Sequence, residues 1–102
     1  MPGACAGIRV VELGRGLASA LAGMVLADFG AEVVRIEPPG GDPLWDEPVS
    51  LLVHRGKRSV TLDLDQADGR DALLRIVADC DVALEGLDPG ESARLGIDAH
   101  AL

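Results

Sequence analysis

The sequence predicts an α/β fold in which a mostly parallel sheet is flanked by helices. Four short runs rich in Val, Ile and Leu are each bounded by glycine, proline or charged residues, as is typical of strands. Two longer segments with helical spacing lie between them, and parallel strands need connections of this kind. At 102 residues, 48% of them hydrophobic, the chain is expected to form one domain over residues 1–102.

The four predicted strands cover residues 8–13, 33–36, 60–64 and 82–84. The first, second and fourth are apolar at adjacent positions, which predicts burial on both faces of a sheet covered by helices. The third alternates apolar and polar residues more strictly, which favours a position at the edge of the sheet.

The first predicted helix runs over residues 17–29. One apolar stripe contains Leu17, Leu21, Met24, Val25 and Phe29. Small residues at positions 20, 23 and 27 allow the helix to approach the sheet closely, and a glycine at position 30 is placed to end it. A second helix is predicted over about residues 66–79, and a short helix or turn over residues 90–95.

The order of these elements predicts one edge of a doubly wound, Rossmann-like sheet, because crossovers between parallel strands are almost always right-handed. Residues 38–57 open with Pro-Pro-Gly-Gly and are predicted to lack regular structure. A loop of this length within a small domain is usually a binding loop or a disordered segment.

Charge and composition exclude several classes of protein. Nine basic and seventeen acidic residues give a net charge of −8, and only 2% of residues are aromatic, which argues against a nucleic-acid partner. No apolar stretch is long enough to span a bilayer, and no secretory leader is recognisable. Cys5 and Cys80 have no zinc-ligand spacing, so we expect a cytoplasmic protein with no membrane partner and no metal.

A glycine-rich turn follows the first predicted strand. Gly14 and Gly16 match the start of a dinucleotide-binding fingerprint, and Glu37 stands where an NAD enzyme places its ribose-binding acid. The third fingerprint position holds Ser19 rather than glycine or alanine. The alternative to NAD binding is a tight turn between strand and helix.

The segment His54–Ser59 concentrates positive charge in an acidic chain. Arg55, Lys57 and Arg58 lie within four positions. Such a cluster suits a ligand that carries several phosphates. A basic turn exposed to solvent explains it equally well.

Four segments together resemble a known family. They read GIRVVEL, LAGMVLADFGAEVVRIEPPGGD, RGKRSVTLDL and DGRDALLRIVADCDVALEGLDPGESARLGID. In this order and spacing they resemble the N-terminal region of the family III CoA-transferases, which include formyl-CoA transferase, carnitine CoA-transferase and α-methylacyl-CoA racemase. The similarity extends from residue 7 to about residue 102.

The resemblance implies a Rossmann-like domain that binds coenzyme A or acyl-CoA, within a long chain that forms an interlocked homodimer. Members of the family transfer CoA from an acyl-CoA to a small carboxylate through an aspartyl anhydride, or racemise an acyl-CoA. It assigns CoA contacts to Leu17, Ala18, Arg55, Lys57, Arg58, Leu62, Asp63, Leu64, Asp65 and Arg94. The chain departs from the family's pattern at His54 and Gly86, each of which replaces a common Asn, and at Pro38, which some members replace with Arg.

No residue of this chain matches the family's catalytic aspartate, so no catalytic residue is assigned. The resemblance therefore predicts the CoA-binding portion of a CoA-transferase or racemase, incomplete for catalysis alone, which self-associates or docks on the rest of the family's large domain. Two alternatives stay open: a non-catalytic binding or interaction module, and the NAD-binding domain of a dehydrogenase.

Overall fold

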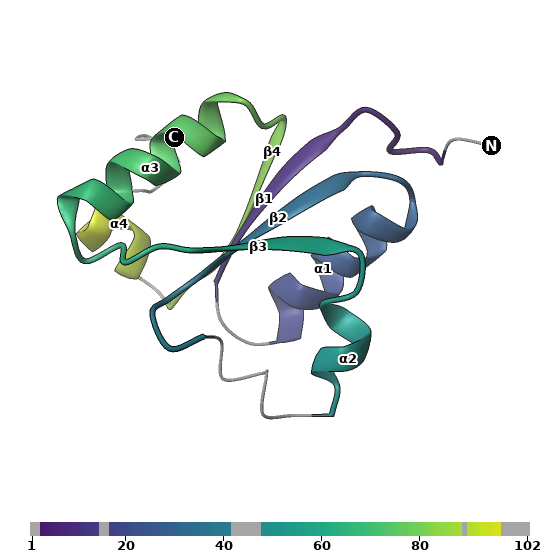
Figure 1. Cartoon of the computed structure of the whole chain (residues 1–102), viewed down its shortest axis with the longest axis horizontal. Helices are drawn as coiled ribbons and strands as arrows, with labels where there is room; N and C mark the ends of the chain where they lie inside the picture. Colours follow the sequence, from purple (N-terminus) through teal and green to yellow (C-terminus); the bar gives the residue numbers. More distant parts are fainter. Residues whose placement is uncertain (1–2, 15–16, 42–47, 89, 97–102) are drawn as a thin grey trace.

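The computed structural model describes residues 3–14, 17–41, 48–88 and 90–96, and within them four strands form one parallel sheet (Figure 1). The strands are β1 (Arg9–Gly14), β2 (Glu32–Glu37), β3 (Lys57–Thr61) and β4 (Val82–Gly86). Their order across the sheet is β3-β2-β1-β4. The chain therefore runs outward from β1 to β3 and returns to the other side of β1, which makes the β1–β4 boundary the topological switch point.

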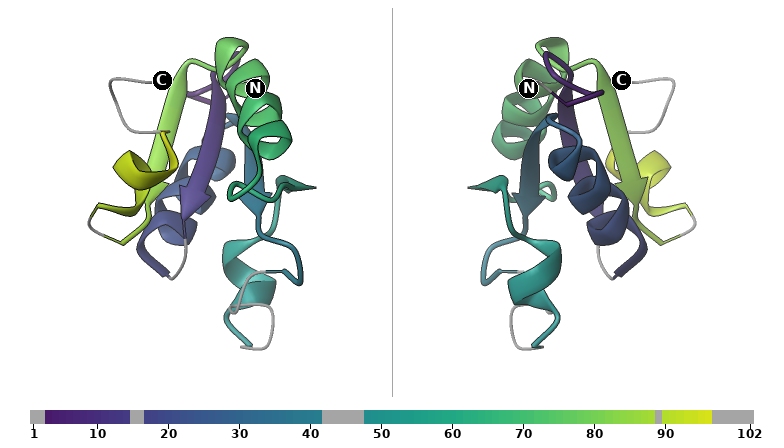
Figure 2. Two further views of the ribbon diagram at one scale, coloured as in Figure 1. Left: turned by 90° about the vertical axis from the view of Figure 1, so that its left-hand side faces the viewer. Right: turned by 90° about the vertical axis from the view of Figure 1, so that its right-hand side faces the viewer.

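Four helices connect and cover the strands. They are α1 (Leu17–Asp28), α2 (Ser50–Val53), α3 (Ala67–Ala78) and α4 (Glu91–Leu95). Helices α3 and α4 lie on one face of the sheet and α1 on the other, with α2 beside α1 (Figures 1 and 2). The expected α/β fold with a parallel sheet and flanking helices is confirmed.

Side-chain alternation along the strands divides the core into two parts. Strands β1 and β2 pair with Val11 opposite Val34 and Leu13 opposite Ile36, which places these side chains on the α3 face. Leu73 of α3 packs against this cluster. The intervening positions of β1 and β2 face α1, where a smaller apolar cluster forms around Val10. The two central strands are buried on both faces, as their sequence predicts.

The two outer strands show where the sequence pattern succeeds and fails. Strand β3 lies at an edge, as its alternation predicts. Strand β4 was expected to be buried on both faces, but none of its residues is buried in this chain. It occupies the opposite edge of the sheet, so only β1 pairs with it among the described strands.

Two further expectations are corrected. The segment between β2 and β3 was predicted to be irregular, but it contains the short helix α2 immediately before β3. Strand β3 also begins at Lys57, three residues before the expected start, so the basic segment is partly strand rather than loop.

Helix α1 packs with its small residues against the sheet. Ser19, Ala20 and Gly23 are buried, whereas Leu17, Leu21, Val25 and Phe29 are 38–53% exposed. An apolar stripe normally faces the core. Here the side of α1 that faces the sheet carries small residues together with Leu26, so the predicted stripe faces outward.

Candidate functional site at the carboxyl edge of the sheet

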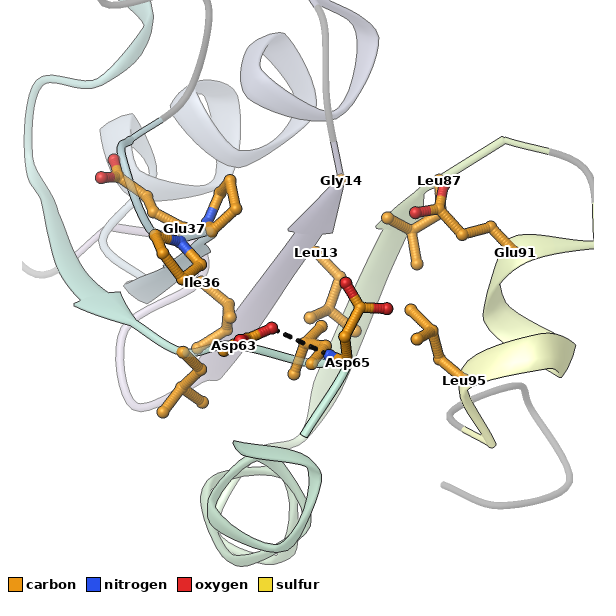
Figure 3. Close-up of a pocket in the computed structure, with 13 residues that line it drawn as sticks. Leu13, Gly14, Ile36, Glu37, Asp63, Asp65, Leu87, Glu91 and Leu95 are labelled. Carbon is orange, nitrogen blue, oxygen red and sulfur yellow. Dashed lines mark hydrogen bonds between the residues drawn. The ribbon is translucent and has the colours of Figure 1, made fainter. Parts of the chain in front are cut away.

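A pocket opens where the described strands end, on the face that carries α3 and α4 (Figure 3). We call it the carboxyl-edge pocket. Its volume is about 90 Å³, and it is lined by Leu13, Gly14, Ile36, Glu37, Pro38, Pro39, Leu62, Asp63, Leu64, Asp65, Leu87, Glu91 and Leu95. Ligand sites in α/β proteins lie at this edge. Because small-molecule pockets usually measure roughly 300–1,000 Å³, this one suits a single ring system rather than a whole cofactor.

Residues 62–65, which follow β3, form one wall of the pocket. The Leu62 backbone N–H donates to the Glu37 carbonyl oxygen at 2.9 Å, which extends the pairing between β2 and β3. Helix α3 starts directly after this wall and packs closely on it, because a Cβ at Gly69 would lie 1.9 Å from the Asp63 carbonyl oxygen. The Arg70 guanidinium donates to the Leu64 carbonyl oxygen at 3.1 Å. The wall is therefore held by strand pairing on one side and by α3 on the other.

Two glycines meet at the topological switch point. Gly14 ends β1 with a φ of +139°, and a Cβ on it would lie 2.7 Å from the Gly86 backbone nitrogen at the end of β4. Any larger residue at position 14 would push the two strand ends apart. The glycine pair keeps the crevice between β1 and β4 free of side chains.

The charged groups at the pocket are mainly acidic. Asp63, Asp65 and Glu91 lie around it, and the Asp63 carboxylate accepts the Asp65 backbone N–H at 3.1 Å (Figure 3). The Arg94 guanidinium lies 3.4 Å from the Asp65 carboxylate, and both side chains are largely exposed. Carboxylates accept hydrogen bonds from hydroxyl and amino groups but repel phosphates. The pocket therefore suits a neutral, hydroxyl-bearing group, and Arg94 offers one cation at its rim.

The structure brings together part of the predicted site. Leu62, Asp63, Leu64 and Asp65 line the carboxyl-edge pocket, and Arg94 pairs with one of them. Leu17 and Ala18 begin α1 and are exposed, but they do not line the pocket.

Sequence reasoning missed most of the remaining pocket walls. They come from the ends of β1 and β2, from the residue that follows β4, and from α4. The prediction of parallel strands could have identified these walls, because parallel strands end at the same edge of a sheet.

The three basic residues expected to share a phosphate site lie apart. Lys57 and Arg58 are consecutive residues of a strand, so their side chains point to opposite faces of the sheet. Arg55 pairs instead with Asp28 at the end of α1, with 2.7 Å between nitrogen and oxygen, and this contact raises the pKa of the guanidinium. Arg55 precedes β3, and Lys57 and Arg58 are its first two residues, so all three lie away from the carboxyl edge. Their assignment to CoA stays a prediction, but they do not form one cluster.

Lys57 belongs to a group of buried charges between the sheet and α1. Its ammonium nitrogen lies 2.7 Å from the Glu12 carboxylate, which also pairs with the Arg35 guanidinium. The Arg35 Nε lies 3.6 Å from the Glu37 carboxylate. Burial lowers the pKa of Lys57, although the hydrogen bond to Glu12 opposes this effect. We call Glu12, Arg35, Glu37 and Lys57 the buried charge group.

His54 is buried beside this group, at the end of α2. Its pKa lies below the usual value of 6.5, chiefly because burial disfavours the charged imidazolium. The positive charges of Arg35 and Lys57 lower the pKa further, while Glu12 and Glu37 oppose the shift.

A second, more open hollow of about 330 Å³ lies at the amino ends of the strands. It is lined by Arg9, Val10, Glu32, Val34, Arg58, Ile76, Asp79 and Cys80. Arg9 and Glu32 form an ion pair there at 3.3 Å. The Cys80 thiol is free and half-buried, and burial raises its pKa, so it behaves as a packing residue.

Among the described residues, no three His, Cys, Asp or Glu side chains form a group that could hold a metal ion. No helix of the described part is long and apolar enough to cross a membrane.

A parallel sheet with helices on both faces and a pocket at its carboxyl edge, beside the switch point, is the arrangement of the doubly wound α/β proteins. Residues 5–102 match the family model of CoA-transferase family III. The chain belongs to this family.

Relatives named as CoA-transferases agree with this placement. The chain is 43% identical over 96 residues to the CoA-transferase/lyase DddD of Marinomonas sp. (strain MWYL1), covering 94% of this chain and 11% of that protein. It is 40% identical over 111 residues to the succinyl-CoA–D-citramalate CoA-transferase of Chloroflexus aurantiacus, covering 93% of this chain and 27% of that protein. The chain thus spans about a quarter or less of these two relatives.

Solved structures show the same fold. A crystal structure of the Mycobacterium tuberculosis protein Rv3272 superposes with a TM-score of 0.90 at 36% identity, covering 97% of this chain and 30% of that one. A CAIB/BAIF family protein from Brucella suis superposes with a TM-score of 0.88 at 32% identity, covering 99% and 30% of the two chains.

Because the chain belongs to CoA-transferase family III, the alternative that it is the NAD-binding domain of a dehydrogenase is wrong. Glu37, its proposed ribose ligand, is buried and lies 3.6 Å from the Arg35 Nε. Gly16, its second glycine, lies outside the described residues.

Proposed function

We propose that this chain binds the CoA part of an acyl-CoA, with the adenosine end in the carboxyl-edge pocket. One observation carries the proposal: the ends of β1 and β2 and the residues that follow β2, β3 and β4 line one hollow beside the switch point. The relatives named as CoA-transferases act on substrates that contain this adenosine group.

The pocket's chemistry fits a nucleoside. Leu13, Ile36 and Leu64 offer apolar surface to the faces of an adenine ring. The carboxylates of Asp63 and Asp65 can accept hydrogen bonds from the free ribose hydroxyl of CoA or from the adenine amino group. A volume of about 90 Å³ matches one ring system, so the rest of CoA extends outside the pocket.

The phosphates of CoA need donors beyond the pocket. Arg94 at the rim offers a guanidinium, and it exchanges its Asp65 partner for a phosphate when CoA binds. We also propose, from the family resemblance, that Leu17 and Ala18 at the start of α1 contact the ligand where it leaves the edge. Pro38 and Gly86 lack the polar side chains of other family members, so we expect weaker binding than in relatives that retain them.

The proposed reaction is transfer of CoA between an acyl-CoA and a small carboxylate. Racemisation of an acyl-CoA is the alternative within the same family. No residue of this chain matches the family's catalytic aspartate, so we propose that the 102-residue chain binds CoA without turning it over. We further propose a cytoplasmic location and a homodimeric parent assembly, which the free thiols of Cys5 and Cys80 and the exposed face of α1 support.

Isothermal titration calorimetry with the purified chain tests the proposal. CoA and adenosine are expected to bind at the same site in competition. The Leu64→Trp variant fills the pocket and is expected to weaken CoA binding by about tenfold or more, while Leu74→Trp, on the exposed side of α3, leaves it unchanged. Absence of CoA binding, or equal binding by the two variants, would overturn the proposal.

A further inference from the structure

The ammonium group of Lys57 links β3, β1 and α1 on the face of the sheet that α1 covers. It belongs to the first residue of β3, and its side chain is only 2% exposed. It donates hydrogen bonds to the Glu12 carboxylate of β1 at 2.7 Å and to the Ala20 carbonyl oxygen of α1 at 2.8 Å. A direct contact with a ligand at the carboxyl edge would require it to leave both partners.

Helix α1 is shaped to admit this contact. At Gly23, a Cβ would lie 2.0 Å from a Glu12 carboxylate oxygen and 3.0 Å from the Lys57 ammonium nitrogen. The missing side chain therefore leaves room for the two charged groups. Ala20, which accepts the hydrogen bond, lies one helical turn after Leu17, so the contact is close to the start of α1.

Among the described residues, the charges of the buried charge group balance. The group contains two carboxylates, Glu12 and Glu37, and two cations, Arg35 and Lys57. Loss of one member leaves an uncompensated charge in a site that excludes water, which is far more costly than loss of a complete pair. His54, which faces the same charges, has a lowered pKa and so does not supply a replacement cation near neutral pH.

We propose that Lys57 is a positioning residue: paired with Glu12, it fixes α1 so that Leu17 and Ala18 stand at the carboxyl edge, and it does not itself bind the ligand. As far as CoA is concerned, this inference rests on the function proposed above. The inference gives Lys57 a different role from Arg55 and Arg58, although the three basic residues are close in sequence.

The test is a double-mutant cycle with Lys57→Gln, Glu12→Gln and both changes together. Each single variant unbalances the buried charge group, whereas the double variant restores neutrality around the remaining Arg35–Glu37 pair. Arg75→Gln removes an exposed charge from α3 and serves as the matched control. Hydrogen exchange is followed at the amides of α1, with those of α3 as an internal reference.

Lys57→Gln is expected to speed exchange in α1 by about tenfold or more relative to α3, and Glu12→Gln to act in the same direction. The double variant is expected to recover most of the protection. This part of the test needs no ligand. The inference is wrong if Lys57→Gln leaves the exchange rate in α1 unchanged. It is also wrong if α1 exchanges as fast in the double variant as in the faster of the two single variants.

Titration with CoA and with adenosine gives the second readout. Lys57→Gln is expected to lower CoA affinity roughly tenfold while adenosine affinity, which depends on the opposite face of the sheet, stays within about twofold. The double variant is expected to regain CoA affinity. If Lys57 contacts CoA directly, the double variant will stay as weak as Lys57→Gln. If the unaltered chain binds no CoA, the proposed function fails, and the exchange data still decide the role of Lys57.

Discussion

Individual residues beneath α1 decide how closely the helix approaches the sheet. The small residues Ala20 and Gly23 were identified from sequence as a close-approach surface, and both are buried against the sheet. The sequence did not predict which residues they approach. Glu12 and Arg35 are single charged residues within apolar strands, and nothing in the sequence indicates that they meet. Only the register, which places Glu12 opposite Arg35, shows that the two charges share one buried site.

We predict that Gly23→Ala destabilises the chain, although alanine favours helix by about 1 kcal/mol over glycine. The added Cβ would lie 2.0 Å from a Glu12 carboxylate oxygen, so α1 or the carboxylate must move. We expect a loss of about 1–3 kcal/mol in the free energy of unfolding, measured by urea denaturation. The control is Ala22→Gly on the exposed side of α1, where helix propensity alone predicts a loss of about 1 kcal/mol. A stabilised Gly23→Ala variant would contradict the packing described here.

The lowered pKa of His54 gives a pH dependence with a definite sign. In the unfolded chain this histidine takes up a proton near pH 6.5, whereas in the folded chain burial resists the charge. The unfolded state therefore binds more protons below that pH, and the free energy of unfolding should fall as the pH decreases from about 7.5 to 5.5.

Urea denaturation across this pH range, for the unaltered chain and for His54→Gln, measures this contribution. The variant should have the flatter profile. The same substitution at His100, the other histidine of the chain, separates the two contributions. Identical slopes for His54→Gln and the unaltered chain would show that His54 titrates normally in the folded state.

At the scale of elements, hydrophobic patterning predicted which segments are helices and strands better than it predicted which way they face. The apolar stripe of α1 points outward, and β4 is exposed. Both elements therefore present apolar surface that the described part of the chain does not cover. Leu51 and Leu52 of α2, which packs beside α1, are also exposed.

We expect the chain to self-associate through α1. Leu21 and Val25 lie at the centre of its exposed stripe, and continuous apolar surface of this kind favours association. Replacing both with lysine should weaken association by about tenfold or more, measured by sedimentation or light scattering. The control is Leu74→Lys, a single exposed leucine on α3 with similar exposure. A monomeric unaltered chain at high concentration would refute this expectation.

The wall of the carboxyl-edge pocket depends on the packing of α3. A Cβ at Gly69 would lie 1.9 Å from the Asp63 carbonyl oxygen, so Gly69→Ala must displace the segment over residues 62–65. We expect CoA affinity to fall by about tenfold and the free energy of unfolding to fall by about 1–3 kcal/mol. Calorimetry and urea denaturation measure the two effects. Ala72→Gly, also in α3 but away from the pocket lining, should reduce stability and leave affinity unchanged.

At the scale of the whole molecule, a ligand that binds only the folded chain must stabilise it. Each tenfold rise in free CoA above its dissociation constant should add about 1.4 kcal/mol to the free energy of unfolding. Thermal unfolding at increasing CoA concentration should therefore show a steadily rising Tm. An unchanged Tm at CoA concentrations that saturate calorimetric binding would be inconsistent with a site on the folded sheet.

The sequence by itself determined the class of fold, the family and the segment that forms one wall of the pocket. These depend on local patterns, namely apolar runs, punctuation by glycine and proline, and the order of motifs. The tertiary structure alone decided which charged residues meet. Residues 55, 57 and 58 are close in sequence but lie apart, because consecutive strand residues face opposite sides of a sheet. Glu12, Arg35 and Lys57 are distant in sequence but share one buried site. Parallel pairing sets Glu12 opposite Arg35 and Lys57 opposite Val33 on the same face of the sheet, and the Lys57 side chain reaches Glu12 from there.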